Sequence, residues 1–269
     1  MNERAHEGSL GGRSALTVIL LIAFAVSLTG IGWNDGVLNA GGLRAVGQIL
    51  AAAIQPQLIL DILSIGARST WTTLAYAWTG MTVALVIGLP LGVIGSGTVV
   101  RSPWARRWNI SSARFALAVF RAIHELVWAW LFVAALGLSP MAGVLALGLP
   151  YGGILGRIYA ELLQDVPDAP LRALRSAGAS EWRVFWFGRL PMALPDMLSY
   201  TFYRLECGIR SAAILSFVGL GGLGHNIQIS LQDIDYPRMW TFVYFLIALV
   251  LVVDLWSSLV RRRVAIEQG

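Results

Sequence analysis

The residues of this sequence that could do chemistry are charged side chains inside long apolar stretches. Arg121 precedes Glu125 by four positions, Glu206 precedes Arg210 by the same spacing, and Arg204 stands nearby. A charge inside an apolar span is costly and faces a partner or water, so each is a functional candidate. Because arginine donates paired hydrogen bonds to oxyanions, the residues are typical of an anion route or gate.

The same spacing has a second interpretation. Residues four apart share one face of a helix, so Arg121 with Glu125, and Glu206 with Arg210, could form two intrahelical ion pairs. Adjacent opposite charges largely satisfy each other, which favours a structural role. We prefer the structural interpretation and retain the route or gate as the alternative.

Histidine and cysteine offer little further chemistry. All 20 basic residues are arginine, which excludes every lysine-dependent reaction, and Cys207 is the only cysteine. The histidines, at positions 6, 124 and 225, are too scattered to indicate a metal site. His124 and Glu125 are adjacent and so point to different helix faces. We expect no metal and no cofactor in this chain, and we group His124 with the candidate route or gate.

Two patterns match catalytic or nucleotide-binding motifs only in part. Ser96 lies between two glycines, but Ile94 stands where a rhomboid-like protease would have glycine. Residues 219–224 match Gly-x-Gly-x-x-Gly, the dinucleotide fingerprint, but they follow an apolar helix and not a strand. We therefore expect no enzyme, and a flexible outer turn at 219–224.

The composition is that of a membrane protein. Hydrophobic residues make up 57% of the 269 and charged residues only 13%, with a mean hydropathy of +0.68, which is more apolar than a soluble domain of this length. The net charge of +5 does not require nucleic acid, because basic residues accumulate on the cytoplasmic side of membrane spans. We expect no nucleic-acid partner.

The sequence predicts an all-α membrane protein with six transmembrane helices, because a bilayer takes about 20 apolar helical residues. The predicted spans are 15–33, 71–97, 115–136, 141–163, 198–218 and 240–260. Prolines and glycines within them are tolerated where neighbouring helices pack closely. The first run could instead be a cleavable signal peptide ending at Ala23-Phe24-Ala25, but its apolar residues continue to Trp33.

The arginines predict that both termini are cytoplasmic. With an inside amino terminus, three arginines lie outside, at positions 44, 68 and 238. Fourteen lie inside, at positions 4, 13, 101, 106, 107, 114, 157, 172, 175, 183, 189, 261, 262 and 263. Such an excess fixes orientation.

The spans divide the chain into sections. The predicted sections are a cytoplasmic tail at 1–14, the first span with an outer amphipathic linker at 15–70, a five-helix core at 71–260 and a cytoplasmic tail at 261–269. Within the linker, Leu43 to Ile65 is expected to form an interfacial helix pair on membrane lipid.

The segment 164–196 is the longest hydrophilic stretch. Pro167 and Pro170 can start a helix that Gly178 ends or bends, and a second apolar-periodic run continues to Pro191. The segment therefore predicts two short helices hinged at a glycine. Its aromatic and small residues suit either docking on another protein or lying on lipid, and the residues alone leave both open.

A motif in this segment resembles the cytoplasmic loop of binding-protein-dependent ABC importer permeases. The glycine at 178 is followed at the spacing of that motif by Leu190-Pro191, whereas Arg172-Ala173-Leu174 replaces its usual Glu-Ala-Ala opening. In the family this loop is the coupling helix that docks in a groove of the ATP-hydrolysing subunit. The coupling residues that the resemblance implies are Ala173, Leu174, Ala177, Gly178, Ala179, Glu181, Leu190 and Pro191.

Two further stretches resemble the phosphonate- and phosphite-type permeases within that family, which are methionine-permease-like subunits. They are 121–128, and 199–211 with the glycine turn, and the similarity covers most of 71–260. His124 stands where proline is expected. In the family the turn lies near the binding-protein face, which assigns that role to Gly219, Gly221, Gly222 and Gly224.

The resemblance implies the permease subunit of an ATP-driven importer in the bacterial inner membrane. Its expected partners are a second permease subunit, forming a homodimer, two ATP-binding subunits that carry ATP and Mg, and an extracytoplasmic substrate-binding protein. The expected substrate is a phosphonate, phosphite or related oxyanion. The alternatives are an ABC permease for another small solute such as an amino acid, or a self-contained channel or secondary carrier.

Overall fold

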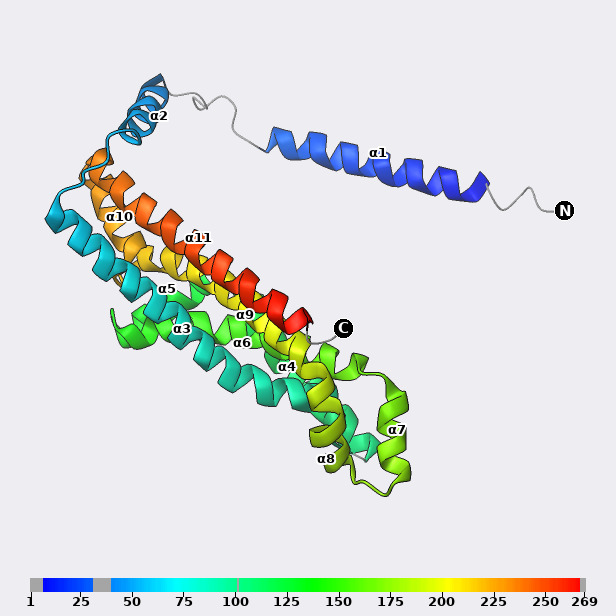
Figure 1. Cartoon of the computed structure of the whole chain (residues 1–269). Helices are drawn as coiled ribbons and strands as arrows, with labels where there is room; N and C mark the ends of the chain where they lie inside the picture. The colour runs from blue at the N-terminus through cyan, green and yellow to red at the C-terminus, as the bar shows by residue number, and fades with distance from the viewer. Residues whose placement is uncertain (1–6, 31–39, 101, 267–269) are drawn as a thin grey trace. The chain divides into compact units, whose positions relative to one another are not determined.

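The computed structural model describes residues 7–30, 40–100 and 102–266, which form helices joined by short turns. The chain divides into two compact units, residues 1–51 and 52–269. Figure 1 shows the helices α1 Glu7–Thr29, α2 Ala40–Ala52, α3 Leu60–Ser96, α4 Pro103–Ala122, α5 Glu125–Leu136, α6 Pro140–Asp165, α7 Asp168–Ser176, α8 Glu181–Val184, α9 Leu190–Leu215, α10 Leu223–Gln232 and α11 Tyr236–Ile266.

Several helices in the described part of the chain are long and apolar enough to cross a membrane. These are α3, α6 and the segment Tyr236–Val260 of α11, and two bent helix pairs raise the number to five. The apolar part of α1, Ser14–Thr29, is shorter. The predicted first span extends to Trp33, outside the described residues, so the sixth span stays a prediction.

Helix α3 is longer than the predicted second span. It starts at Leu60, so it includes the last residues of the stretch Leu43 to Ile65 that is predicted to form an interfacial helix pair. It also runs through the predicted section boundary at residue 70. Pro56 lies in the turn before it, and Gln57 joins this turn to α11 by accepting a hydrogen bond of 2.9 Å from Thr241 Oγ1. At the other end of the chain, α11 continues to Ile266, into the expected tail.

The prediction of one helix over 115–136 is wrong. Helix α4 ends at Ala122, and α5 begins at Glu125, at an angle of 86° to it. Ile123 and His124 have extended backbones, and the His124 Nδ1 accepts a hydrogen bond of 3.3 Å from the Leu126 N–H. His124 therefore caps a new helix, a local role that a count of apolar residues does not detect.

The core is built on close contact between α3 and α6, which lie side by side (Figure 1). Glycines lie at multiples of four residues on the facing sides, at 80, 88 and 92 of α3, with alanine at 84, and at 148, 152 and 156 of α6. A Cβ on Gly88 would lie 3.1 Å from both the Gly152 oxygen and the Gly156 nitrogen. Small residues at this spacing let two backbones touch, which gives α6 a fixed place at the centre.

Substitution of Gly92 tests this packing. A Cβ there would lie 2.9 Å from the Gly156 carbonyl oxygen and 3.0 Å from the Tyr159 Cβ. Gly92→Val should lower the free energy of unfolding by about 1–3 kcal/mol, as overpacking of a close contact does. The measurement is the thermal unfolding midpoint in detergent. Gly47→Val is the control, because a Cβ on Gly47 meets nothing within 4 Å. Equal midpoints for the two variants would contradict the account.

Candidate functional site

Helix α6 is buried on most sides and keeps one open face. Before its exposed last two residues, the exposed or half-buried residues of its second half recur at helical spacing, and they are Ile154, Arg157, Ile158, Glu161 and Leu162. We call these five residues the open face. A cavity of about 150 Å³ lies between this face and α4, and a wider one of about 500 Å³ lies between it and α9.

Two tyrosines that line the cavity beside α9 also contact an arginine. Arg204 Nε donates a hydrogen bond of 3.0 Å to the Tyr200 hydroxyl. Its guanidinium also lies 5.8 Å from the centre of the Tyr203 ring, within the range of a cation–π contact. Tyr200 and Tyr203 line the cavity together with Asp196 and Ser199. Arg204 is therefore held in place by two of the residues that line this cavity.

A polar chain joins α5, α6 and α9. Ser211 Oγ donates a hydrogen bond of 2.7 Å to Glu125 Oε1 and lies 3.0 Å from the Tyr151 hydroxyl. Because the serine has one hydrogen, Tyr151 is the donor in the second bond. His124 Nε2 lies 3.7 Å from Glu125 Oε2. Three helices thus share one hydrogen-bonded chain, which couples any shift of α9 to the α4–α5 bend.

Of the two predicted ion pairs, one is confirmed. Arg210 pairs with Glu206 on α9, with the Glu206 side chain buried and the Arg210 side chain half exposed. The Arg121–Glu125 intrahelical pair is wrong, because α4 ends between the two residues. Glu125 contacts Ser211 instead, and Arg121 lines the cavity between α4 and α6.

The glycine turn at 219–224 is anchored to α3, whereas the sequence predicted a flexible turn. The Tyr76 hydroxyl donates a hydrogen bond of 2.9 Å to the Leu220 carbonyl, and the Leu223 N–H donates one of 3.0 Å to Thr73 Oγ1. Gly222 has φ +94, and a Cβ there would lie 2.8 Å from Thr73 Oγ1. The turn therefore needs glycine for backbone shape and close packing. The role of facing a binding protein stays a prediction.

Helices α7 and α8 form the hinged pair that the sequence predicts. Gly178 has φ +85, and the Ala179 N–H donates to the Leu174 carbonyl, which closes α7 with a Schellman motif. Leu171 is buried. A Cβ on Gly188 would lie 2.9 Å from Leu171 and 2.8 Å from Leu174. The absence of a side chain at Gly188 thus allows α7 to pack against the turn Phe185–Arg189 that follows α8.

The predicted end of the second helix at Pro191 is wrong. The π-helical turn Phe185–Arg189 joins α8 directly to α9, and the Leu190 N–H donates to the Phe185 carbonyl. A π-turn shifts the hydrogen-bond register by one residue. Pro191, which lacks an N–H, is accommodated in the first turn of α9. Helices α8 and α9 therefore form one continuous body.

Polar contacts connect the segment 164–196 to the last turns of α6 and α3. The Arg189 side chain is buried and donates to the Leu163 carbonyl in the last turn of α6. Gln164 Nε2 donates a hydrogen bond of 2.9 Å to the Ser96 carbonyl at the end of α3. Sequence reasoning did not select these residues, because their partners are distant in the chain and no local pattern marks them.

The predicted coupling residues present an accessible surface. Ala173, Ala177, Gly178 and Pro191 are exposed, and Leu174, Ala179, Glu181 and Leu190 are half buried. Trp182, Trp186 and Phe187 are exposed beside them. Arg175 lies 3.9 Å from Asp168 of its own helix and 3.3 Å from Glu181, and the second pair holds α7 to α8. The structure therefore brings the predicted set together on one segment.

Comparison with known proteins identifies the family. Residues 88–266 match the binding-protein-dependent transport system inner membrane components. The chain is 30% identical to the phosphite transport system permease protein PtxC of Stutzerimonas stutzeri over 90% of this chain and 86% of that protein. It is 30% identical to the phosphate-import permease protein PhnE of Mycolicibacterium smegmatis over 71% of this chain and 35% of that protein.

A solved structure has the same fold. A chain of the MetNI methionine ABC transporter, in an inward-facing conformation, matches with a TM-score of 0.65 and 24% identity over 77% of this chain and 99% of that chain. The present chain belongs to the family of binding-protein-dependent transport system inner membrane components. It is a permease subunit of an ABC importer with the all-α permease fold, a multi-pass membrane protein and a transport component, not an enzyme.

Ser211→Ala tests the polar chain. The substitution removes the donor to Glu125 and the acceptor for Tyr151, so it should lower the free energy of unfolding by about 1–3 kcal/mol, the cost of unpaired polar groups in a largely buried site. Thermal unfolding of the purified chain measures this loss of stability. The control is Ser112→Ala, whose hydroxyl is exposed and bonds only locally, to the Asn109 carbonyl. A Ser211 variant as stable as this control would rule out the proposed linkage.

Proposed function

We propose that the chain is the permease of an ATP-driven importer for phosphite, a phosphonate or a related phosphorus oxyanion. The observation that carries the transport role is the continuous body of α8 and α9, which links the exposed coupling segment to the edge of the open face. The names of the relatives, which are permeases for phosphite and for phosphate, support the substrate class.

The proposed assembly contains two permease subunits, two ATP-binding subunits and an extracytoplasmic binding protein. The exposed small residues around Gly178 give a surface on which an ATP-binding subunit can seat. The glycine turn lies at the opposite end of α9 and would meet the binding protein. This arrangement requires both termini in the cytoplasm, as the arginine distribution predicts.

The proposed mechanism is a rigid-body switch. ATP binding closes the two ATP-binding subunits, and each moves the segment α7 to α8 of its permease. Because α8 continues into α9, the α9 residues that line the cavity beside the open face move together with α8. The hydrogen bond from Ser211 to Glu125 carries this shift to α5. The open face then alternates between the two sides of the membrane, and hydrolysis resets it.

Gly178→Asp tests the coupling role. The variant should abolish ATP-dependent uptake of radiolabelled phosphite in cells, while expression and membrane insertion stay intact, because it changes the surface between α7 and α8. The measurement is uptake together with co-purification of an ATP-binding subunit on a carboxyl-terminal tag.

The matched control is Gly137→Asp. Gly137 also has a positive φ, +72, with nothing within 4 Å of an added Cβ, and it lies at the opposite end of α6. We expect this variant to retain uptake. Equal loss in both variants would mean that backbone strain alone is responsible. Normal uptake in Gly178→Asp would favour a self-contained channel or carrier.

A further inference from the structure

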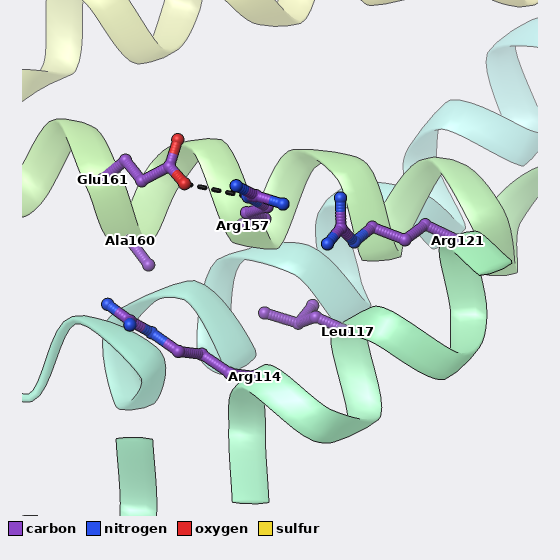
Figure 2. Close-up of a pocket in the computed structure, with 6 residues that line it drawn as sticks. All are labelled: Arg114, Leu117, Arg121, Arg157, Ala160 and Glu161. Carbon is purple, nitrogen blue, oxygen red and sulfur yellow. Dashed lines mark hydrogen bonds and ion pairs between the residues drawn. The ribbon is translucent and has the colours of Figure 1, made fainter. Parts of the chain in front are cut away.

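The cavity between α4 and α6 is lined by three arginines and one carboxylate (Figure 2). Its lining residues are Arg114, Leu117, Arg121, Arg157, Ala160 and Glu161. Three positive and one negative side chain leave a formal charge of +2. Leu117 and Ala160 are buried and form an apolar floor. The volume of about 150 Å³ is enough for a small oxyanion.

Close packing of the two helices brings the arginines together. A Cβ on Gly153 would lie 2.8 Å from the Leu117 carbonyl oxygen and 3.1 Å from the Arg121 nitrogen. The backbones of α4 and α6 therefore touch at Gly153, one turn before Arg157. Arg121 lies at this contact on α4, and Arg157 lies one turn beyond it on α6. Their two positive side chains therefore line the same cavity. An arrangement of this kind is unfavourable unless an anion or water screens it.

Among the residues that the structure describes, acceptors are found for only two N–H groups of the cavity's three arginines. Arg157 Nε lies 2.8 Å from Glu161 Oε1, and both side chains are about half exposed. Arg114 Nη2 reaches Gln164 Oε1 at a long 3.4 Å. Each guanidinium has five N–H donors. In Figure 2 the ends of Arg121 and Arg157 point toward one another above Leu117, and Arg114 extends toward Ala160.

We propose that Arg114, Arg121 and Arg157 form a binding station for a phosphorus oxyanion within the permease. This inference rests on the proposed function and gives the open face a substrate site. Arginine pairs bidentately with phosphate groups, and three arginines from two helices line this one cavity. The station lies about two helical turns before the end of α6, toward the coupling segment. Glu161 competes for Arg157, which keeps the anion releasable.

The test uses the whole transporter in liposomes, with loaded binding protein outside and ATP inside. We expect the double variant Arg121→Gln/Arg157→Gln to accumulate at least tenfold less radiolabelled phosphite per ATP hydrolysed, because it loses charge-assisted hydrogen bonds. Arg121→Lys/Arg157→Lys should be intermediate, since it keeps the charge but not the paired donors. Arg107→Gln, an exposed arginine of α4 outside the cavity, should match the wild type.

Anionic lipid headgroups share this phosphate chemistry, so the assay is run with and without anionic lipid. A deficit that is the same in both supports the station, whereas a deficit that needs anionic lipid assigns the arginines to lipid and overturns it. Unchanged uptake in the glutamine variant overturns it too, as does loss of the assembled transporter on size-exclusion chromatography in both double variants. A wild type that moves no phosphorus oxyanion refutes the proposed function and the station together.

Discussion

The architecture depends on the contact of α6 with its two neighbours through glycine. Gly152 meets α3, Gly153 meets α4 and Gly156 meets both, each at a distance where an added Cβ would force its neighbours to shift. In a membrane there is no hydrophobic driving force between helices, so such close packing is what holds a bundle together. With α3 and α4 packed against it, α6 exposes the open face, and the arginine-lined cavity and the cavity beside α9 both adjoin that face.

A second constraint links this static core to movement. The π-turn Phe185–Arg189 makes α8 and α9 one body, and Arg189 fastens its start to the last turn of α6. A force applied to the coupling segment therefore acts on α9 directly and reaches α6 through the Arg189–Leu163 hydrogen bond and through the contacts of α9 with α6, such as Ser211 with Tyr151. Helix α9 in turn holds Tyr200 and Ser211, so the same body lines the cavity beside the open face and carries the polar chain.

Sequence reasoning predicted the features that local patterns encode. Apolar runs placed α6 and α11 to within a few residues, the glycine at 178 marked the hinge, and spacing of four identified the Glu206–Arg210 pair. It did not predict the break at His124, where one capping contact outweighs an apolar pattern, or the passage of the helix through Pro191, which depends on a π-turn. The Arg114–Arg157 grouping was not predictable, because it arises from contact between helices distant in sequence.

The central claim is that ATP drives a phosphorus oxyanion through this permease. The most direct measurement is accumulation of radiolabelled phosphite in liposomes that contain the purified permease with its ATP-binding subunit and binding protein. The account predicts accumulation above the external concentration with ATP, none with a non-hydrolysable analogue, and competition by other phosphorus oxyanions but not by methionine. Equilibration of phosphite down its gradient without ATP would contradict the account, because it would identify a channel or carrier.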